Sequence, residues 1–161
     1  MAVVLPIGPV WLLATGRDAS AYRAPADSLA AIAEQAGCEL TEFRDGMDTN
    51  PPVNGEFVER IRARDGSYAG ERPPSLPASI HALYHGRVLL QYRPGLSTDQ
   101  LASLERLVGD EVLLFENQTS MPSPVAATAY LSLITCPRVD GRTLQALEAF
   151  RDRRRAFGQA F

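Results

Sequence analysis

The sequence predicts a single α+β domain in which a small mixed β-sheet is flanked by helices. Three observations support this class. The chain has 161 residues, 45% apolar and 22% charged, which is ordinary for one globular domain with its own core. Short apolar runs and amphipathic segments alternate in the second half in the order β-α-β-β-α. A long irregular loop region separates that half from a first helix, so we expect one domain over residues 23–161.

The N-terminal segment, residues 1–22, is apolar over residues 2–14, but that stretch contains Pro6, Gly8 and Pro9, and no positive residue precedes it. A membrane-spanning helix needs about 20 apolar residues, and a signal peptide normally begins with a basic region. Two interpretations therefore stay open for residues 1–22: the remnant of an export or anchor segment, or a strand packed on the domain.

A first helix is predicted over residues 25–36, with Pro25 in its first turn and Gly37 at its end. Residues 39–77 follow, and their many Pro and Gly residues are typical of turns. An irregular stretch of this length inside a compact domain is more often a functional surface than a passive connection. We therefore expect a functional site beside it.

Two apolar strands are predicted over residues 87–92 and 111–116. A single helix connects them, and Ser97 with Gln100 forms a capping-box pattern at its start. One helix between two strands favours parallel pairing.

The third strand of the second half is predicted over residues 125–136, where β-branched residues are frequent. Asp140 or Thr143 then caps a last helix with Leu144, Leu147 and Phe150 on one face. The expected arrangement is a mixed sheet with helices against one face.

His81 and His85 are the only two histidines, and they stand four residues apart. On a helix, residues at this spacing face the same way with Cβ atoms about 5–6 Å apart. On a strand they would lie about 13 Å apart. The pair therefore indicates chemistry only if the segment is helical or tightly turned.

Copper is the metal favoured for a site with such a histidine pair. Met47 and Met121 both lie in irregular segments, and thioethers beside imidazoles suit copper. The predicted metal ligands are His81, His85, Met47 and Met121. Zinc is the alternative cofactor, held by both histidines and the two cysteines if these are reduced.

Two other interpretations of the histidines stay open. In the first, both bond backbone carbonyls of the long loop, as buried polar groups must, and the domain is structural or protein-interacting. In the second, a histidine acts as a base with Ser67, Ser79 or Tyr84 as its hydroxyl partner. Because the sequence has no nucleophile elbow and no phosphate loop, an enzyme is the less favoured class.

Cys38 and Cys136 are the only cysteines. In an exported protein such a pair forms a disulfide, whereas in a cytosolic protein it is two buried thiols. A bond closing a loop of about 100 residues would stabilise the fold by about 4–5 kcal/mol.

The segment Ile-His-Ala-Leu-Tyr-His-Gly-Arg-Val, residues 80–88, resembles the Val-His-Ser-Leu-Glu-His-Gly-Arg-Val signature of the bacterial domain-of-unknown-function family 3105. Similarity extends to three further segments of the family: residues 50–55 resemble its Pro-Pro-Thr-Ser-Gly-Pro-His, residues 66–68 its Gly-x-Tyr, and residues 125–136 its strand ending in Cys. Together the resemblance covers residues 37–155.

The resemblance implies an extracytoplasmic domain, usually behind a membrane segment, with no established activity. It also implies that Cys38 and Cys136 are bonded. The chain departs from the family at Glu56 and Phe57, where the family has a third histidine, and at Tyr84, where it has Glu.

The function predicted from the sequence is an exported, copper-binding module. Its expected partners are a metal ion or a metal-delivery protein, with a membrane tether as an open alternative. Nucleic acid is not expected as a partner, because the formal net charge is −3 and duplex binding needs a basic face. The alternative is a non-catalytic structural or protein-interaction domain.

Overall fold

The computed structural model of the chain describes residues 28–44 and 48–158, so residues 1–22 and Met47 lie outside the described part. Its elements along the chain are α1 (Leu29–Ala36), β1 (Glu39–Glu42), β2 (Gly66–Ser67), α2 (Leu76–Tyr84), β3 (Val88–Tyr92), α3 (Thr98–Glu105), β4 (Val112–Glu116), β5 (Val125–Ala129), β6 (Ser132–Cys136) and α4 (Gly141–Gly158). The predicted α+β class with a mixed sheet is confirmed.

The strands form one sheet in the order β1-β6-β5-β3-β4-β2. Strand β4 pairs in parallel with both β3 and β2, and the other pairs are antiparallel. Val88 lies opposite Val112, so the parallel pairing predicted for the two strands joined by one helix is confirmed.

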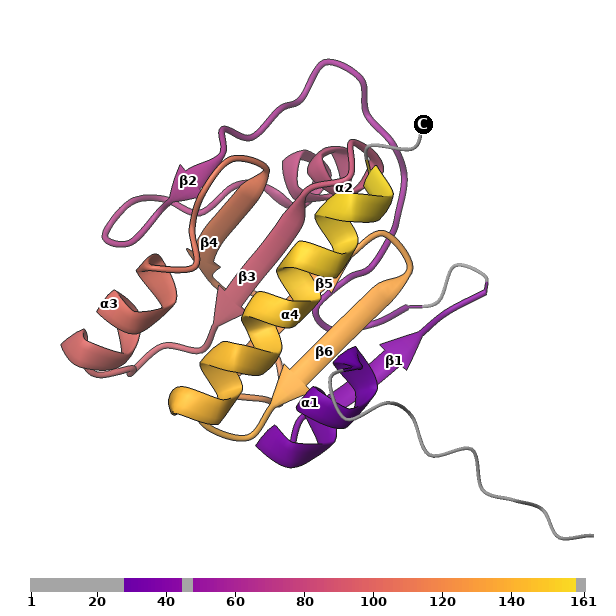
Figure 1. Cartoon of the computed structure of the whole chain (residues 1–161). Coiled ribbons are helices and arrows are strands. Elements are labelled where there is room, and N and C mark those ends of the chain that lie inside the picture. Colours follow the sequence, from indigo (N-terminus) through magenta and orange to yellow (C-terminus); the bar gives the residue numbers. More distant parts are fainter. Residues whose placement is uncertain (1–27, 45–47, 159–161) are drawn as a thin grey trace, which may run out of the picture.

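The helices cover both faces of the sheet, so the prediction of helices against one face was wrong. Val88 and Leu90 of β3 belong to the larger core, which contains residues of α1, α3 and α4. Leu89, which points to the other face, packs in a second core with Leu83 of α2. Figure 1 shows α4 and α1 in front of the sheet and α2 beyond it. Since β3 is buried on both faces, its apolar run carries no alternation that would reveal this.

Residues 125–136 form a hairpin of two strands, β5 and β6, rather than the single strand predicted. The turn lacks the usual Asn-Gly or Asp-Gly signal and contains Leu131 at φ 56°. Two backbone hydrogen bonds support the turn: Leu131 N–H donates to Val53 O at 3.1 Å, and Phe43 N–H donates to Leu131 O at 2.9 Å. Tertiary contacts therefore hold a turn that local sequence does not signal.

Two short strands, β1 and β2, lie in the stretch predicted to be irregular. Strand β1 has Glu39 and Glu42 at its ends and pairs only with β6, while β2 has two residues and pairs with β4. They occupy the two edges of the sheet. Such short strands carry little periodic signal.

The capping predictions have three outcomes. Ser28 caps α1, which begins at Leu29, and Pro25, predicted for the first turn, lies outside the described residues. The capping box of Ser97 and Gln100 is confirmed. Asp140 caps α4 by accepting from Thr143 N–H at 2.9 Å. That bond, followed by the one from Arg138, lowers the pKa of Asp140 to about 2.

Cys38 and Cys136 form a disulfide, with their Cα atoms 4.3 Å apart. It joins the residue that precedes β1 to the last residue of β6. A disulfide is compatible with an extracytoplasmic location. Across residues 28–44 and 48–158, none of the helices combines the length and the apolar character that crossing a membrane requires.

Candidate binding site around the two histidines

The histidine segment is helical, as the interpretation of the pair required. Helix α2 begins after Ser75, with Pro77 in its first turn, and His85 is its C-cap. The rings of His81 and His85 lie side by side, with centroids 4.6 Å apart and planes 35° apart.

His81 holds the long loop on α2. Its side chain is 4% exposed, and its Nδ1 lies 2.9 Å from the carbonyl oxygen of Val58. Because a carbonyl only accepts, Nδ1 carries the proton and donates. One helical turn on, the Tyr84 hydroxyl donates to Gly55 O at 3.2 Å. Gly55 itself passes so close that a Cβ there would lie 3.1 Å from Ile80 Cδ1.

An aromatic cluster covers these contacts. Phe57 stacks on His81 with centroids 4.8 Å apart and also contacts His85 and Tyr84. Tyr84 in turn contacts Tyr130 of the β5–β6 turn at 4.8 Å. Burial, followed by a hydrogen bond with Tyr84, raises the pKa of Tyr130. Thus Phe57 and Tyr84, two of the positions at which the sequence departs from the family resemblance, both belong to this cluster.

Both histidine rings line one small pocket, which we call the histidine pocket. It has a volume of about 150 Å³ and is lined by Arg62, Ala63, His81, Ala82, His85 and Arg87. Desolvation, followed by the positive charges of His81, Arg87 and Arg62, lowers the pKa of His85. Sequence reasoning missed both arginines. Arg87 lies two residues from His85, whereas only the folded loop brings Arg62 there.

The two predicted methionine ligands are not brought to this pocket by any described contact. Met121 is buried beside the end of β4, where its N–H donates to Asn117 Oδ1 at 3.1 Å, and Met47 lies outside the described residues. Within residues 28–44 and 48–158, no three His, Cys, Asp or Glu side chains group to hold a metal. Because the bond to Val58 uses Nδ1 of His81, Nε2 is the nitrogen with which this residue would ligate a metal. Copper binding stays a prediction, and so does zinc.

Two of the three hydroxyl partners considered for catalysis make other contacts in the structure, and the third is buried. Ser67 Oγ donates to Glu105 Oε1 at 3.0 Å, and Ser79 is buried in α2. Tyr84 donates to the loop, as described above. These contacts do not pair Ser67 or Tyr84 with a histidine base.

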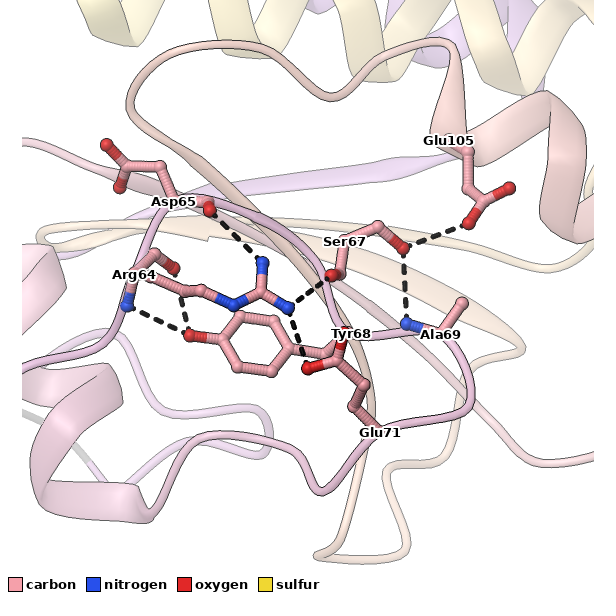
Figure 2. Close-up of polar contacts among 7 residues, drawn as sticks. All are labelled: Arg64, Asp65, Ser67, Tyr68, Ala69, Glu71 and Glu105. Carbon is pink, nitrogen blue, oxygen red and sulfur yellow. Dashed lines mark hydrogen bonds and ion pairs between the residues drawn. The ribbon is translucent and has the colours of Figure 1, made fainter.

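Residues 64–71 of the loop are fixed by their own contacts (Figure 2). The Arg64 guanidinium lies over the Tyr68 ring, 4.4 Å from its centroid, and donates to Ser67 O and Glu71 Oε2. The bond from Ser67 to Glu105 ties the same segment to α3. Arg64 is therefore engaged away from the histidine pocket.

A larger groove lies between α2 and the loop. It has a volume of about 510 Å³ and is lined by Asp48, Thr49, Asn50, Pro52, Asn54, Gly55, Glu56, Val58, Leu76, Pro77, Ile80 and Thr119. The groove shares no lining residue with the histidine pocket. Sequence reasoning placed a site beside this loop but did not identify the groove.

Asn117 does not line the groove itself, but it holds the lining residue Thr119 in position. Its Nδ2 donates to the buried Gln91 Oε1 at 2.8 Å, and its Oδ1 accepts from Thr119 N–H at 2.9 Å. Thr119 Oγ1 then donates to Asn50 Oδ1 at 2.6 Å, and Asn50 Nδ2 donates to Thr119 O at 2.6 Å. The loop is thereby tied to the end of β4. A polar residue directly after an apolar strand was the one sequence signal for Asn117.

Comparison with known protein families finds a match. The model of the family described as "Protein of unknown function (DUF3105)" matches residues 46–156, more than half of the chain. No curated protein and no solved structure matches.

Proposed function

The chain belongs to the family described as a protein of unknown function (DUF3105), and we propose that it is an extracytoplasmic domain that binds an extended polypeptide in the groove. This develops the alternative in which the histidines hold the loop of an interaction domain. The observation that carries it is the hydrogen bond from His81 to Val58 O, which fixes one wall of the groove.

The size and lining of the groove suit a ligand. Its volume of about 510 Å³ lies in the range of about 300–1,000 Å³ typical of ligand sites. Pro52, Val58, Leu76, Pro77 and Ile80 supply an apolar lining, and Leu76 is 55% exposed. A loop already held in position costs a ligand less ordering entropy on binding.

The surroundings favour a polypeptide over a compact small molecule. Phe57 and Tyr84 are exposed next to the groove, since Phe57 stands between two lining residues in the chain and Tyr84 bonds a third. Tyr130, also exposed, contacts Tyr84. Exposed aromatic residues with an apolar and a polar part are enriched in protein interfaces. The groove and the aromatic cluster thus form one surface.

The negative charge of the groove indicates which residues a partner should carry. Asp48 and Glu56 are the charged residues among its described lining, and both are exposed. An apolar side chain would fill the groove, and Lys or Arg beside it would face these carboxylates. We therefore expect an apolar anchor flanked by basic residues.

A displayed library of random twelve-residue peptides, selected on the oxidised protein, tests the proposal. Enriched peptides should carry an apolar anchor next to Lys or Arg. Fluorescence polarisation of a synthetic enriched peptide should show at least tenfold weaker binding to Leu76→Ser. Ile61→Ser is the matched control, because Ile61 is exposed outside the groove. Failure to enrich any such peptide, or equal binding by Leu76→Ser, would overturn the proposal.

The extracytoplasmic location rests on the disulfide, because disulfides persist in oxidising compartments. Trapping of free thiols in intact cells that produce the full-length protein tests it. Both cysteines should resist alkylation until a reductant is added. Alkylation without reductant would contradict the location.

A further inference from the structure

The histidine pocket gathers positive charge without a carboxylate in its lining. Its polar lining consists of Arg62, His81, His85 and Arg87, and the remaining two lining residues are alanines. The protein as a whole carries a formal net charge of −3, so this concentration runs against its overall sign.

The two arginines of the pocket, Arg87 and Arg62, differ in whether a carboxylate already pairs with them. Arg87 donates from Nε to Asp65 Oδ1 at 2.6 Å, which leaves its two terminal nitrogens. Arg62 forms no ion pair within residues 28–44 and 48–158. Arg64, the neighbouring cation, is paired with Glu71 and turned to Ser67, as Figure 2 shows.

The histidines add donors of fixed direction. Since Nδ1 of His81 is committed to Val58 O, only its Nε2 remains to meet a ligand. His85 is exposed and lies against His81, and each nitrogen becomes a donor when its ring is protonated. Desolvation is the first cause of the lowered pKa of His85, and the positive charges of His81, Arg87 and Arg62 lower it further; a bound anion would offset these charges.

We propose that the histidine pocket binds an oxyanion of the phosphate or sulfate type, held by Arg62, Arg87 and His85. Guanidinium groups bond such anions through two parallel N–H groups. The volume of about 150 Å³ exceeds the roughly 30 Å³ that one water takes up, so a tetrahedral anion fits with bound water. The histidine pocket and the groove share no lining residue, so variants can test them separately, although the His81–Val58 bond borders both.

The two histidines make the test direct, because only two imidazole C2–H signals exist in the chain. Their NMR titration is followed from pH 5 to 8 in sodium chloride and in sodium sulfate at equal ionic strength, with His85→Phe to assign the signals. The groups facing His85 in this titration are His81 on α2, Arg62 on the loop and Arg87, with Asp65 behind Arg87. We expect sulfate to raise the pKa of His85 in a saturable way.

Arg62→Gln should weaken sulfate binding at least tenfold, while Arg60→Gln, an exposed arginine outside the pocket, should leave it unchanged. Arg62 is itself exposed, so its loss does not endanger folding. Equal pKa values of His85 in chloride and sulfate, or equal responses of wild type and Arg62→Gln, would overturn the proposal. Peptide binding in the groove should survive Arg62→Gln, which separates the two tests.

The same chemistry has two sources, a free anion and a lipid headgroup. Inorganic phosphate and phosphatidylcholine vesicles with or without phosphatidic acid distinguish them. Binding of phosphate with no preference between the vesicles assigns a free anion. Arg62-dependent binding that is tighter to vesicles with phosphatidic acid than to inorganic phosphate assigns a headgroup, and binding of neither would overturn the site.

Discussion

The imidazole Nδ1 of His81 lies 2.9 Å from the carbonyl oxygen of Val58, a residue 23 positions earlier in the chain. This single contact joins a buried helix to the long loop and borders both candidate sites. Val58 lines the groove, and His81 lines the histidine pocket.

Replacement of His81 by Phe should release the loop. The Phe ring preserves the stacking on Phe57 but leaves Val58 O without its donor, which costs about 1–3 kcal/mol of unfolding free energy. Urea unfolding measures the loss, and hydrogen exchange should quicken in residues 55–58. His85→Phe is the control, because His85 is exposed. Equal stability of the two variants would show that the bond has no net effect.

Loss of the disulfide should destabilise the fold strongly. The bond spans 98 residues, and closing a loop of that length stabilises the folded state by about 4–5 kcal/mol in the chain-entropy model. The Cys38→Ser, Cys136→Ser double variant should show this decrease in urea unfolding. A decrease below about 1 kcal/mol would mean that the reduced chain already keeps these segments together.

Asn117→Ala should loosen the wall of the groove. Asn117 bonds Gln91 and the amides of Thr119 and Met121, and each buried group left without a partner costs about 1–3 kcal/mol. We expect a loss of about 3 kcal/mol in thermal or urea unfolding and weaker peptide binding. Gln118→Ala, at an exposed neighbour, should change neither. Intact peptide binding by Asn117→Ala would separate the groove from this network.

His85 should make stability depend on pH. Its pKa in the folded state lies below the ordinary 6.5, so the unfolded chain takes up the proton first as pH falls. In chloride buffer the free energy of unfolding should therefore decrease as pH falls from 6.5 to the folded pKa, and level off below it for this group. His85→Phe should lack this component. An identical pH profile of the two proteins would contradict the shift.

Copper content tests the metal prediction against the oxyanion site. Because Arg62 and Arg87 oppose a second cation, the oxyanion site predicts equal copper and zinc in wild type and in the His81→Ala, His85→Ala double variant after metal loading and dialysis, whereas the metal site predicts a loss in the variant. Met121→Leu should leave the metal content unchanged and should change the free energy of unfolding by less than about 1.5 kcal/mol. Copper retained only by proteins with both histidines would favour the metal and count against the anion.

The fold was predictable where local signals agree with tertiary structure. The capping box at Ser97, the Asp140 cap and the strand–helix–strand unit all follow from short-range patterns. The turn at Leu131 was not, because its geometry depends on hydrogen bonds to Val53 and Phe43 from elsewhere in the chain. The position of α2 on the opposite face was hidden for a similar reason: a strand buried on both sides does not indicate which helix covers which side.

The candidate site was predictable in place but not in composition. Helical spacing alone brings His81 and His85 together, and that expectation is confirmed. Val58 and Arg62 reach α2 only through the path of an irregular loop, which has no periodicity to read. Met121 lies in a segment that looks like a loop in sequence, yet it is buried and its N–H bonds Asn117.

The strand order also bears on self-association. The apolar strands β3 and β5 lie inside the sheet, and its edge strands are β1 and β2. Strand β1 has a glutamate at each end, and β2 is only two residues long. A second molecule adding edge-on would find either carboxylates or too few backbone groups to bond. The architecture thereby disfavours edge-to-edge joining of sheets into fibrils, a hazard that a sheet with such apolar strands would otherwise face.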